Sequence, residues 1–274
     1  MASVAKHSAP KRAGHVRHIG IAAILTLIAA PLVWLVLNAV YRLPQEGSAQ
    51  AVRIDQLFQA HFIMISLLFA MIVVPTIYAL VVFRRDEFDD EDAEHIHGNN
   101  LLEAIWIIIP TIVVLGFGVW GFDILRDITA PQQGEMEIVV KGFQWGWFFD
   151  YPEAGVTGSS DLVVPVGTPI KFVLESTGNN KVLHSFWVPE WRVKQDVLPV
   201  ETPEERRIIR VTPTLLGSTM VRCAEICGTG HHSMRANVYI VPQDSFEAWL
   251  AGEMTIEEIV AADNIEPLPL GANQ

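Results

Sequence analysis

Three long apolar segments in the first half of the chain constrain its fold more than any other feature. They cover residues 19–41, 62–85 and 101–125. Each reaches or exceeds the roughly 20 residues that a helix needs to cross about 30 Å of hydrocarbon. Each also contains a proline, which membrane helices tolerate better than soluble ones. The sequence therefore predicts two or three transmembrane helices in the N-terminal half.

The first apolar segment has two interpretations. Basic residues precede it and Ser48-Ala49-Gln50 follows it, which is the pattern of a secretory signal with a small-residue cleavage site. However, the segment is longer than the roughly 7–15 apolar residues of a signal peptide. We therefore favour an uncleaved helix over residues 19–41, preceded by a cytoplasmic tail over residues 1–18. The signal interpretation stays open.

The basic residues near the ends of the apolar segments predict the orientation of the chain. Arg17 precedes the first segment, and Arg84 and Arg85 end the second. Because lysine and arginine mark the cytoplasmic side, the N-terminus is expected in the cytoplasm. The third segment then carries the rest of the chain to the outer or periplasmic side of a cell or inner membrane.

Residues 126–243 have the pattern of an exterior all-β domain. Short β-branched runs alternate with Gly, Pro and Asn, which is typical of a sandwich or barrel. The predicted strands are residues 137–142, 161–166, 170–175, 182–188, 206–211, 218–223 and 235–241. Residues 155–160 and 176–180 are predicted as loops. A peripheral helix is expected over 244–262, within a C-terminal segment of residues 244–274.

Most of the negative charge lies in the exterior part of the chain. From Phe122 onward there are 21 acidic and 11 basic residues, so about −10 of the formal net charge of −12 lies there. Nucleic-acid binding is disfavoured, because it needs a basic surface. A basic protein partner is favoured, because complementary charge speeds association. Ordinary solvated acidic surface is the alternative explanation.

Both cysteines of the chain lie in one stretch of twelve residues. It reads Cys223-Ala224-Glu225-Ile226-Cys227-Gly228-Thr229-Gly230-His231-His232-Ser233-Met234. Thiolate, imidazole and a weak methionine donor are the ligand types of copper electron-transfer sites. Two cysteines can also bridge two metal ions. His184, in the strand-like run of residues 182–189, is the candidate for the second imidazole.

The two cysteines have two other interpretations. A disulfide between Cys223 and Cys227 would close a very small loop and so constrain the unfolded chain little. A structural zinc site would find three of its four ligands in two cysteines and a histidine. Met234 argues against zinc, because zinc seldom binds a thioether. The sequence therefore favours a redox site.

Two patterns in the sequence resemble subunit II of the haem-copper cytochrome c oxidases. They are Cys-x-Glu-x-Cys-Gly-x-x-His-x-x-Met from Cys223 and, before it, His-Ser-Phe-Trp-Val-Pro from His184. The resemblance implies transmembrane helices followed by a cupredoxin-like Greek-key β-barrel. The expected fold class is thus membrane α plus all-β.

The resemblance also implies a dinuclear copper centre, CuA, and the role of each ligand. The ligands would be the bridging thiolates of Cys223 and Cys227, one imidazole each from His184 and His231, the weak donor Met234 and the backbone carbonyl of Glu225. The Glu225 side chain would reach a magnesium ion at the border with subunit I.

Two further residues match the family outside the copper motif. Trp145 lies in an aromatic stretch similar to the family's Gln-Trp-x-Trp segment, whose first tryptophan receives the electron from cytochrome c. Alternating aromatic residues in a strand are otherwise most often core residues. Glu103 matches the family's Glu-x-x-Trp motif, whose glutamate lies at the entrance of a proton channel into subunit I. A carboxylate at a helix end can also simply reach the interface.

The function that the resemblance implies is that of subunit II in a proton-pumping terminal cytochrome c oxidase, an oxidoreductase and proton translocase. It would take electrons from a c-type cytochrome or similar donor and pass them to haem in subunit I, where oxygen is reduced. Other oxidase subunits and membrane lipid would be its neighbours. The alternatives are a copper-free quinol oxidase subunit with a structural role and a stand-alone copper-binding module. The intact ligand set counts against the first, and the three apolar segments count against the second.

Overall fold

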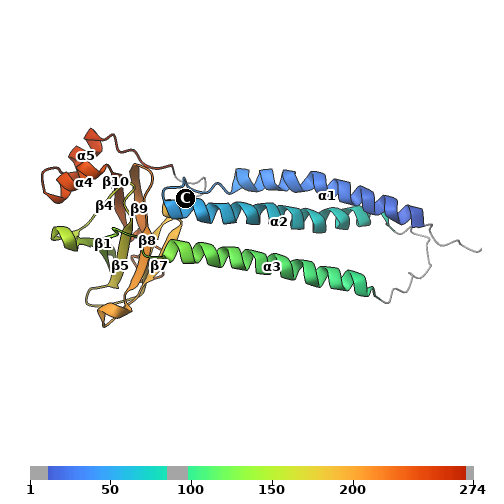
Figure 1. The fold of residues 1–274 in the computed structure, drawn as a ribbon, viewed down its shortest axis with the longest axis horizontal. Helices are drawn as coiled ribbons and strands as arrows, with labels where there is room; N and C mark the ends of the chain where they lie inside the picture. Colours follow the sequence, from blue (N-terminus) through green and yellow to red (C-terminus); the bar gives the residue numbers. More distant parts are fainter. Residues whose placement is uncertain (1–11, 85–97, 270–274) are drawn as a thin grey trace, which may run out of the picture. The chain divides into compact units, whose positions relative to one another are not determined.

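The computed structural model describes residues 12–84 and 98–269. Three long helices precede two β-sheets, and two short helices follow them (Figure 1). The described residues form two compact units. The helical unit contains the chain up to Arg42 together with Phe58–Val114, and the β unit contains Leu43–Leu57 together with the chain from Leu115 onward.

The three long helices correspond to the three apolar segments of the sequence. They are α1 (Arg12–Val40), α2 (Ala49–Val82) and α3 (Asn100–Thr129). All three are long and apolar enough to cross a membrane. Helix α2 begins at Ala49, thirteen residues before the predicted start at residue 62. Its first turns contain polar residues such as Arg53 and Asp55, so they are helical but not apolar. Hydropathy detects only the apolar part of such a helix.

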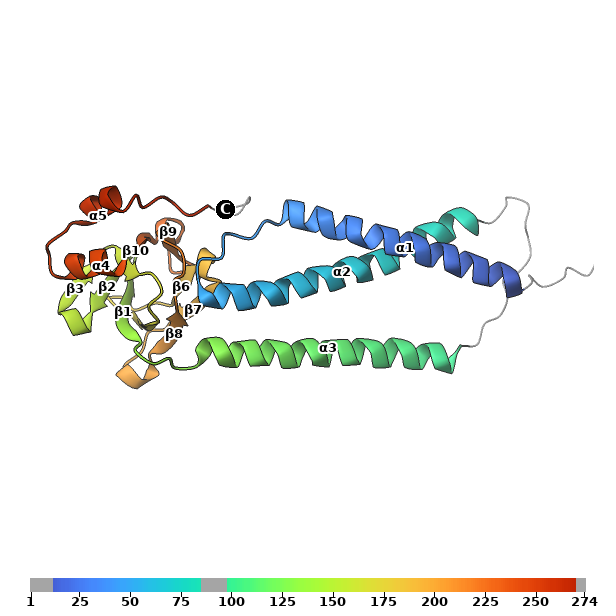
Figure 2. The same cartoon turned by 45° about the horizontal axis from the view of Figure 1, so that its top comes forward.

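Helices α1 and α2 run beside each other in the helical unit (Figure 2). Near the start of α1, His18 Nδ1 lies 2.7 Å from the Tyr78 hydroxyl of α2. Towards the other end of α1, the amide of Gln59 donates a hydrogen bond of 3.3 Å to the Asn38 side chain. Two polar contacts, one towards each end, therefore join this antiparallel helix pair.

The β unit contains two five-stranded sheets. The first has the order β3-β2-β1-β5-β8 and the second the order β4-β10-β9-β6-β7. The strands of the first sheet are β1 (Met136–Phe143), β2 (Gly146–Tyr151), β3 (Val156–Ser159), β5 (Ile170–Ser176) and β8 (Arg207–Val211). Those of the second are β4 (Leu162–Pro165), β6 (His184–Val188), β7 (Val193–Val197), β9 (Gly217–Cys223) and β10 (Arg235–Val241). The chain crosses repeatedly between the sheets, and the predicted cupredoxin-like all-β domain is confirmed.

The two sheets enclose an aromatic and aliphatic core. On β1, Ile138 and Val140 are fully buried, as the two-residue period of a strand requires for side chains on one face. Phe172 of the first sheet packs on Phe186 of the second with ring centroids 5.3 Å apart. This contact joins the two sheets through strand β6, which contains Phe186 and begins with His184.

Three strands lie outside the predicted ranges: β2, which is in the aromatic stretch around Trp145, and two further strands, β3 and β7. Residues 155–160 were expected to form a loop, but β3 lies there and pairs with β2, with Phe149 opposite Ser159. Strand β7 was not predicted because Lys194, Gln195 and Asp196 give it a polar centre. It is held by antiparallel pairing with β6. Strands β3 and β7 lie at sheet edges, where one side needs no apolar pattern.

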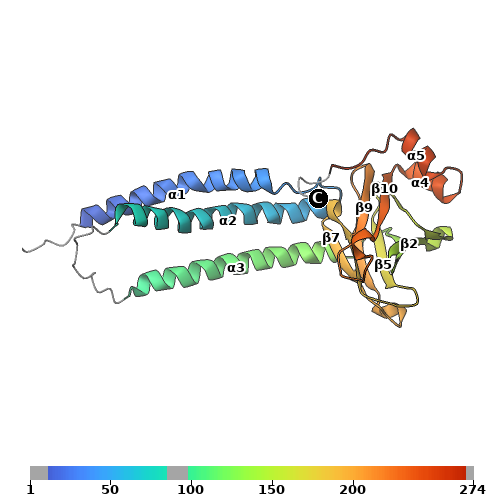
Figure 3. The same cartoon turned by 180° about the vertical axis from the view of Figure 1, so that it is seen from behind.

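The predicted peripheral helix over 244–262 is two helices, α4 (Gln243–Leu250) and α5 (Ile256–Ala262), visible from behind in Figure 3. Gly252 with φ +73° belongs to the turn between them. Thr255 then starts α5 with a capping box, in which its side chain and that of Glu258 bond each other's backbone N–H groups.

The segment after α5 runs along β9. The Ser218 N–H donates to the Glu266 carbonyl, and the Leu268 N–H donates to the Ser218 carbonyl, both at 2.8 Å. Gly217 makes this approach possible, because a Cβ there would lie 2.7 Å from Leu268 Cδ2. The same strand ends at Cys223.

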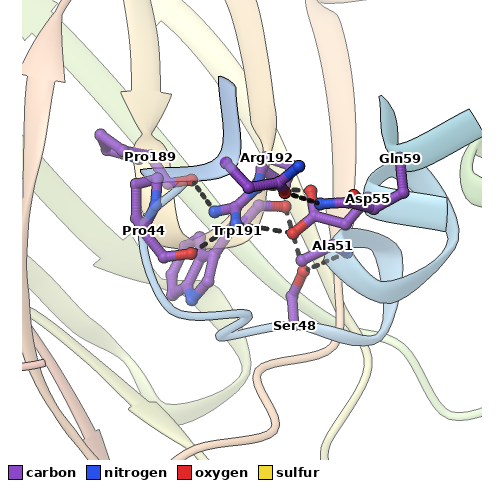
Figure 4. A network of polar contacts seen from close by, with 9 residues as sticks. Pro44, Ser48, Ala51, Asp55, Gln59, Pro189, Trp191 and Arg192 are labelled. Carbon is purple, nitrogen blue, oxygen red and sulfur yellow. Dashed lines mark hydrogen bonds and ion pairs between the residues drawn. The ribbon is translucent and has the colours of Figure 1, made fainter. Parts of the chain in front are cut away.

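The first turns of α2 are bound to the turn between β6 and β7, within the β unit. The Arg192 guanidinium donates hydrogen bonds to the Asp55 carboxylate and to the carbonyls of Pro44 and Pro189 (Figure 4). The Ser48 hydroxyl donates to the Trp191 carbonyl at 3.0 Å. These contacts attach the α1–α2 connection to the segment that follows β6.

Candidate metal centre

Strands β6 and β9 bring His184 and Cys223 together. The two strands are antiparallel neighbours, with Phe186 opposite Cys223. The Ala224 N–H donates to the Ser185 carbonyl at 3.0 Å, which continues the pairing past the end of β9. The first residue of β6 and the last residue of β9 therefore lie beside each other.

The loop between β9 and β10 supplies the other candidate ligands. It turns at Gly228, whose φ of +118° favours glycine, and contains a short 3-10 helix over His231–Ser233. The Cys223 N–H donates to the Met234 carbonyl at 3.1 Å and closes the base of the loop. This closure brings Cys227, His231 and Met234 back towards Cys223.

The two cysteines are free, and their Sγ atoms lie 3.8 Å apart. A disulfide would need a separation of about 2.05 Å. Together with His184 they form a cluster whose potential ligand atoms all lie within 4.8 Å of one another.

Each sulfur has one imidazole nitrogen and one weak donor beside it. Cys223 Sγ lies 3.9 Å from His184 Nδ1 and 3.2 Å from the Glu225 carbonyl oxygen. Cys227 Sγ lies 3.6 Å from His231 Nδ1 and 3.6 Å from the Met234 sulfur. The six residues thus form two groups of three, one around each sulfur. His232 is exposed and takes no part.

Burial sets the protonation of these groups. Desolvation, and secondarily the neighbouring His231, lowers the pKa of His184, so its imidazole is neutral and has a free lone pair at pH 7. Desolvation, and secondarily the Cys223 thiol, raises the pKa of Cys227. A buried thiolate pair therefore needs a compensating positive charge, as bound metal ions provide. His184 Nε2 is buried and has no hydrogen-bond partner.

Gly142 makes room for His184, a role that sequence reasoning missed. A Cβ at this position of β1 would lie 3.2 Å from His184 Cδ2 and 3.1 Å from Trp147 Cζ3. Trp147 in turn lies edge-on to the imidazole, with ring centroids 6.1 Å apart. The first sheet therefore determines the space in which the His184 ring lies.

Trp145 lies in the turn between β1 and β2, against the metal loop. Its indole Nε1 donates to the Cys227 carbonyl at 3.3 Å, and the Gln144 amide donates to the same oxygen at 2.6 Å. Trp145 is 42% exposed, whereas Trp147, two residues later, is buried. The turn thus separates the accessible indole of Trp145 from the aromatic side chains of the core. Gln144 also contacts the site, although the sequence did not single it out.

Glu103 lies in the first turn of α3, in the helical unit, and its side chain is exposed. The Asn99 side chain begins this helix by accepting hydrogen bonds of 3.1 Å from the N–H groups of Leu101 and Leu102. The structure does not bring Glu103 into the cysteine cluster, which lies in the β unit.

Comparison with known proteins gives a consistent result. The model of the cytochrome c oxidase subunit II transmembrane domain matches residues 33–124, and that of the periplasmic domain of the same subunit matches residues 155–241. Cytochrome c oxidase subunit 2 of Thermostichus vulcanus is 28% identical over 261 residues, covering 76% of this chain and 77% of the relative.

The names of two further relatives give different electron donors. Cytochrome c oxidase subunit 2 of Alkalihalophilus pseudofirmus is 32% identical over 211 residues, covering 74% of this chain and 58% of the relative. Quinol oxidase subunit 2 of Bacillus cereus is 27% identical over 199 residues, covering 69% of this chain and 65% of the relative. Similarity alone therefore leaves the electron donor open.

Proposed function

Since the chain belongs to the cytochrome c oxidase subunit II family, a component of haem-copper terminal oxidases, we propose that it carries a dinuclear copper centre, CuA, and transfers electrons from a c-type cytochrome or similar donor to haem in subunit I. Oxygen reduction belongs to that subunit.

One observation carries the copper proposal. Two sulfur atoms 3.8 Å apart each have one imidazole nitrogen and one weak donor beside them. Cys223 and Cys227 would then bridge two ions, His184 and His231 would each bind one of them, and Met234 and the Glu225 carbonyl would be weak donors. Soft sulfur donors with imidazole favour copper. When bound, such a pair accepts and releases one electron with little change in its bonds, because the charge is shared by two ions.

The chain's own residues prepare the site for that chemistry. The buried sulfurs, His184 and Met234 exclude water, and the pairing of β6 with β9 holds the imidazole of His184 in place. Rigid orientation of ligands by their neighbours is what tunes a metal site. We also propose that the half-buried Glu225 binds magnesium through its side chain at the subunit I border, in addition to its carbonyl contact with Cys223.

Trp145 is the proposed point at which electrons arrive. Its indole is partly exposed and hydrogen-bonded to the backbone of Cys227, so it connects the surface of the β unit with a proposed copper ligand. The excess of acidic residues in this part of the chain supports a basic donor protein.

Glu103 is proposed to lie at the entrance of a proton path into subunit I. Its exposed position in the first turn of α3 supports this role. The basic residues Arg17 and Arg84, near the ends of the first two apolar segments, support a cytoplasmic position for that end of the helices.

We propose that α1 stays in the membrane as a third helix. Most of it precedes the family match, which begins at residue 33. Its support comes from the contacts of His18 with Tyr78 and of Asn38 with Gln59, which satisfy polar side chains between two apolar helices.

The competing function is that of a quinol oxidase subunit without copper, as the quinol oxidase relative suggests. The convergence of all the proposed sulfur and nitrogen ligands favours the copper site. The test is the copper content and electron spin resonance spectrum of the purified full-length chain after copper loading. Two copper ions per chain, with hyperfine splitting from an electron shared by two nuclei, would support the proposal. One ion, zinc or no metal would refute it.

A further inference from the structure

We infer that Gly230 is a positioning residue: the indole of Trp145 fits into the space where a side chain at residue 230 would be. The inference rests on the function proposed above, in which Trp145 receives electrons for the metal centre.

The indole lies against the backbone of Gly230. A Cβ on Gly230 would lie 2.5 Å from Cδ2, 2.7 Å from Cγ and 2.8 Å from Cε3 of Trp145. Real Cβ atoms essentially never make non-bonded contacts this short. All three atoms belong to the rigid ring system, so the whole indole would have to move.

The backbone of Gly230 does not itself require glycine. Its φ of −88° and ψ of 10° are accessible to any residue. Gly228, two residues earlier, differs because its φ of +118° is a conformation that side chains rarely adopt. The need for glycine at residue 230 therefore comes from the indole, whereas the need at residue 228 comes from the turn.

A hydrogen bond also holds the ring, because its Nε1 donates to the Cys227 carbonyl. The ring lies close to Gly228 as well, since a Cβ there would be 3.2 Å from Cζ2. The indole thus lies over the loop that joins Cys227 to His231, with Gly230 directly before the histidine. Displacing the ring would lengthen its route to the Cys227 sulfur, and electron transfer slows steeply with distance.

The first test is a double-mutant cycle that needs no metal and no electron donor. Gly230→Ala and Trp145→Ala are made singly and together in the full-length chain, and thermal unfolding of the copper-free β unit is followed. Gly230→Ala should lower the melting temperature by about 3 °C or more with Trp145 present and by much less in the Trp145→Ala background. Thr229→Ala, at the exposed neighbouring residue, is the control and should not couple with Trp145. Additive effects of Gly230→Ala and Trp145→Ala would overturn the inference.

The second test measures reduction of the copper-loaded chain by a reduced c-type cytochrome and by hexaammineruthenium(II), which is small enough to react without a docking surface. Gly230→Ala should lower the ratio of the cytochrome rate to the ruthenium rate severalfold, as Trp145→Phe should, with copper content unchanged. Thr229→Ala should keep the ratio. Loss of copper in Gly230→Ala would overturn the inference, because the glycine would then serve metal binding.

The two tests separate failure of the inference from failure of the proposed function. If the double-mutant cycle shows coupling but neither Gly230→Ala nor Trp145→Phe changes the rate ratio, the role of Trp145 in receiving electrons is refuted. The positioning role then falls with it, although the packing of the indole on Gly230 stands. If Trp145→Phe lowers the ratio and Gly230→Ala does not, only the inference about Gly230 is refuted.

Discussion

The Arg192 guanidinium and the Asp55 carboxylate form two charge-assisted hydrogen bonds of 2.7 Å, and both side chains are more than nine-tenths buried. The two residues are 137 positions apart in the chain. The pair attaches the first turns of α2 to the connection that follows β6, the strand that begins with His184. Arg192 makes this contact from a left-handed conformation, with φ 59°.

Removal of one partner of this pair should therefore destabilise the β unit. Asp55→Ala leaves the guanidinium buried without its countercharge, and we expect the free energy of unfolding of the β unit to fall by about 3–5 kcal/mol. Denaturant unfolding of the detergent-solubilised chain measures it. Asp55→Ala combined with Arg192→Leu should recover part of the loss. Glu137→Gln, at the more exposed pair with Lys171, is the control and should cost about 1 kcal/mol or less.

Met234→Leu should keep both copper ions and raise the reduction potential. The two side chains have similar volumes, so the buried site should lose less than about 1.5 kcal/mol of stability. Without the weak thioether donor, the oxidised copper should be less stable relative to the reduced copper. A redox titration measures the reduction potential, and metal analysis measures the copper content. Met220→Leu, elsewhere on β9, should leave the potential unchanged. Loss of copper from Met234→Leu would contradict the weak-donor role.

Gly142→Ala should disturb His184 without removing any ligand. The new Cβ would lie 3.2 Å from the imidazole and 3.1 Å from Trp147, which is tighter than nine in ten real Cβ contacts. We expect the free energy of unfolding to fall by about 1–3 kcal/mol and copper affinity to decrease. Competition with a copper chelator measures the affinity. Unchanged affinity and stability would show that the His184 ring is not confined by β1.

Tyr151 should make stability fall at alkaline pH. Its hydroxyl donates to the Val163 carbonyl and accepts from the Val163 N–H, both at 2.9 Å, linking β2 to β4. Burial raises its pKa well above the ordinary value of 10.0. The folded chain therefore keeps the proton while the unfolded chain releases it, so this contribution is complete below pH 10 and is lost progressively as the pH rises above it.

Unfolding of the copper-free chain between pH 8 and pH 11 tests this effect. Tyr151→Phe should weaken the alkaline loss and cost about 1–3 kcal/mol at pH 8 through the lost hydrogen bonds. Tyr239→Phe is the matched control, because burial also raises the pKa of Tyr239 but that side chain is only half-buried. An equal alkaline loss in the wild type and Tyr151→Phe would refute the assignment.

Local patterns in the sequence were enough to predict the three apolar helices and most strands. They failed where pairing, not side-chain pattern, determines the structure. Strand β3 contains Gly158 and has no buried residue, and β7 has a polar centre, so neither has an apolar signal of its own. The break between α4 and α5 differs, because it has a local signal in Gly252 and in the Thr255–Glu258 capping box.

The candidate ligands were recognisable because thiol, imidazole and thioether fall in one short motif. Their division into two halves around the sulfur pair was not, since His184 comes from a different strand. Gly142, Gln144 and Gly230 also carried no local signal. A glycine that makes room for a ring on another element looks like any other glycine until both elements are placed.

The pairing of residues 266–268 with β9 has a consequence for how the chain matures. Synthesis proceeds from the N-terminus, so this segment is made after every residue of the cluster. Until it arrives, the Gly217–Ser218 end of β9 is paired with β10 alone, because β6 pairs only with the Arg222–Cys223 end, and its other edge is the kind of unpaired surface that invites aggregation. The strand that ends at Cys223 is therefore completed late in biogenesis, and loss of these residues would leave a newly made chain with its thiols in place and that edge unprotected.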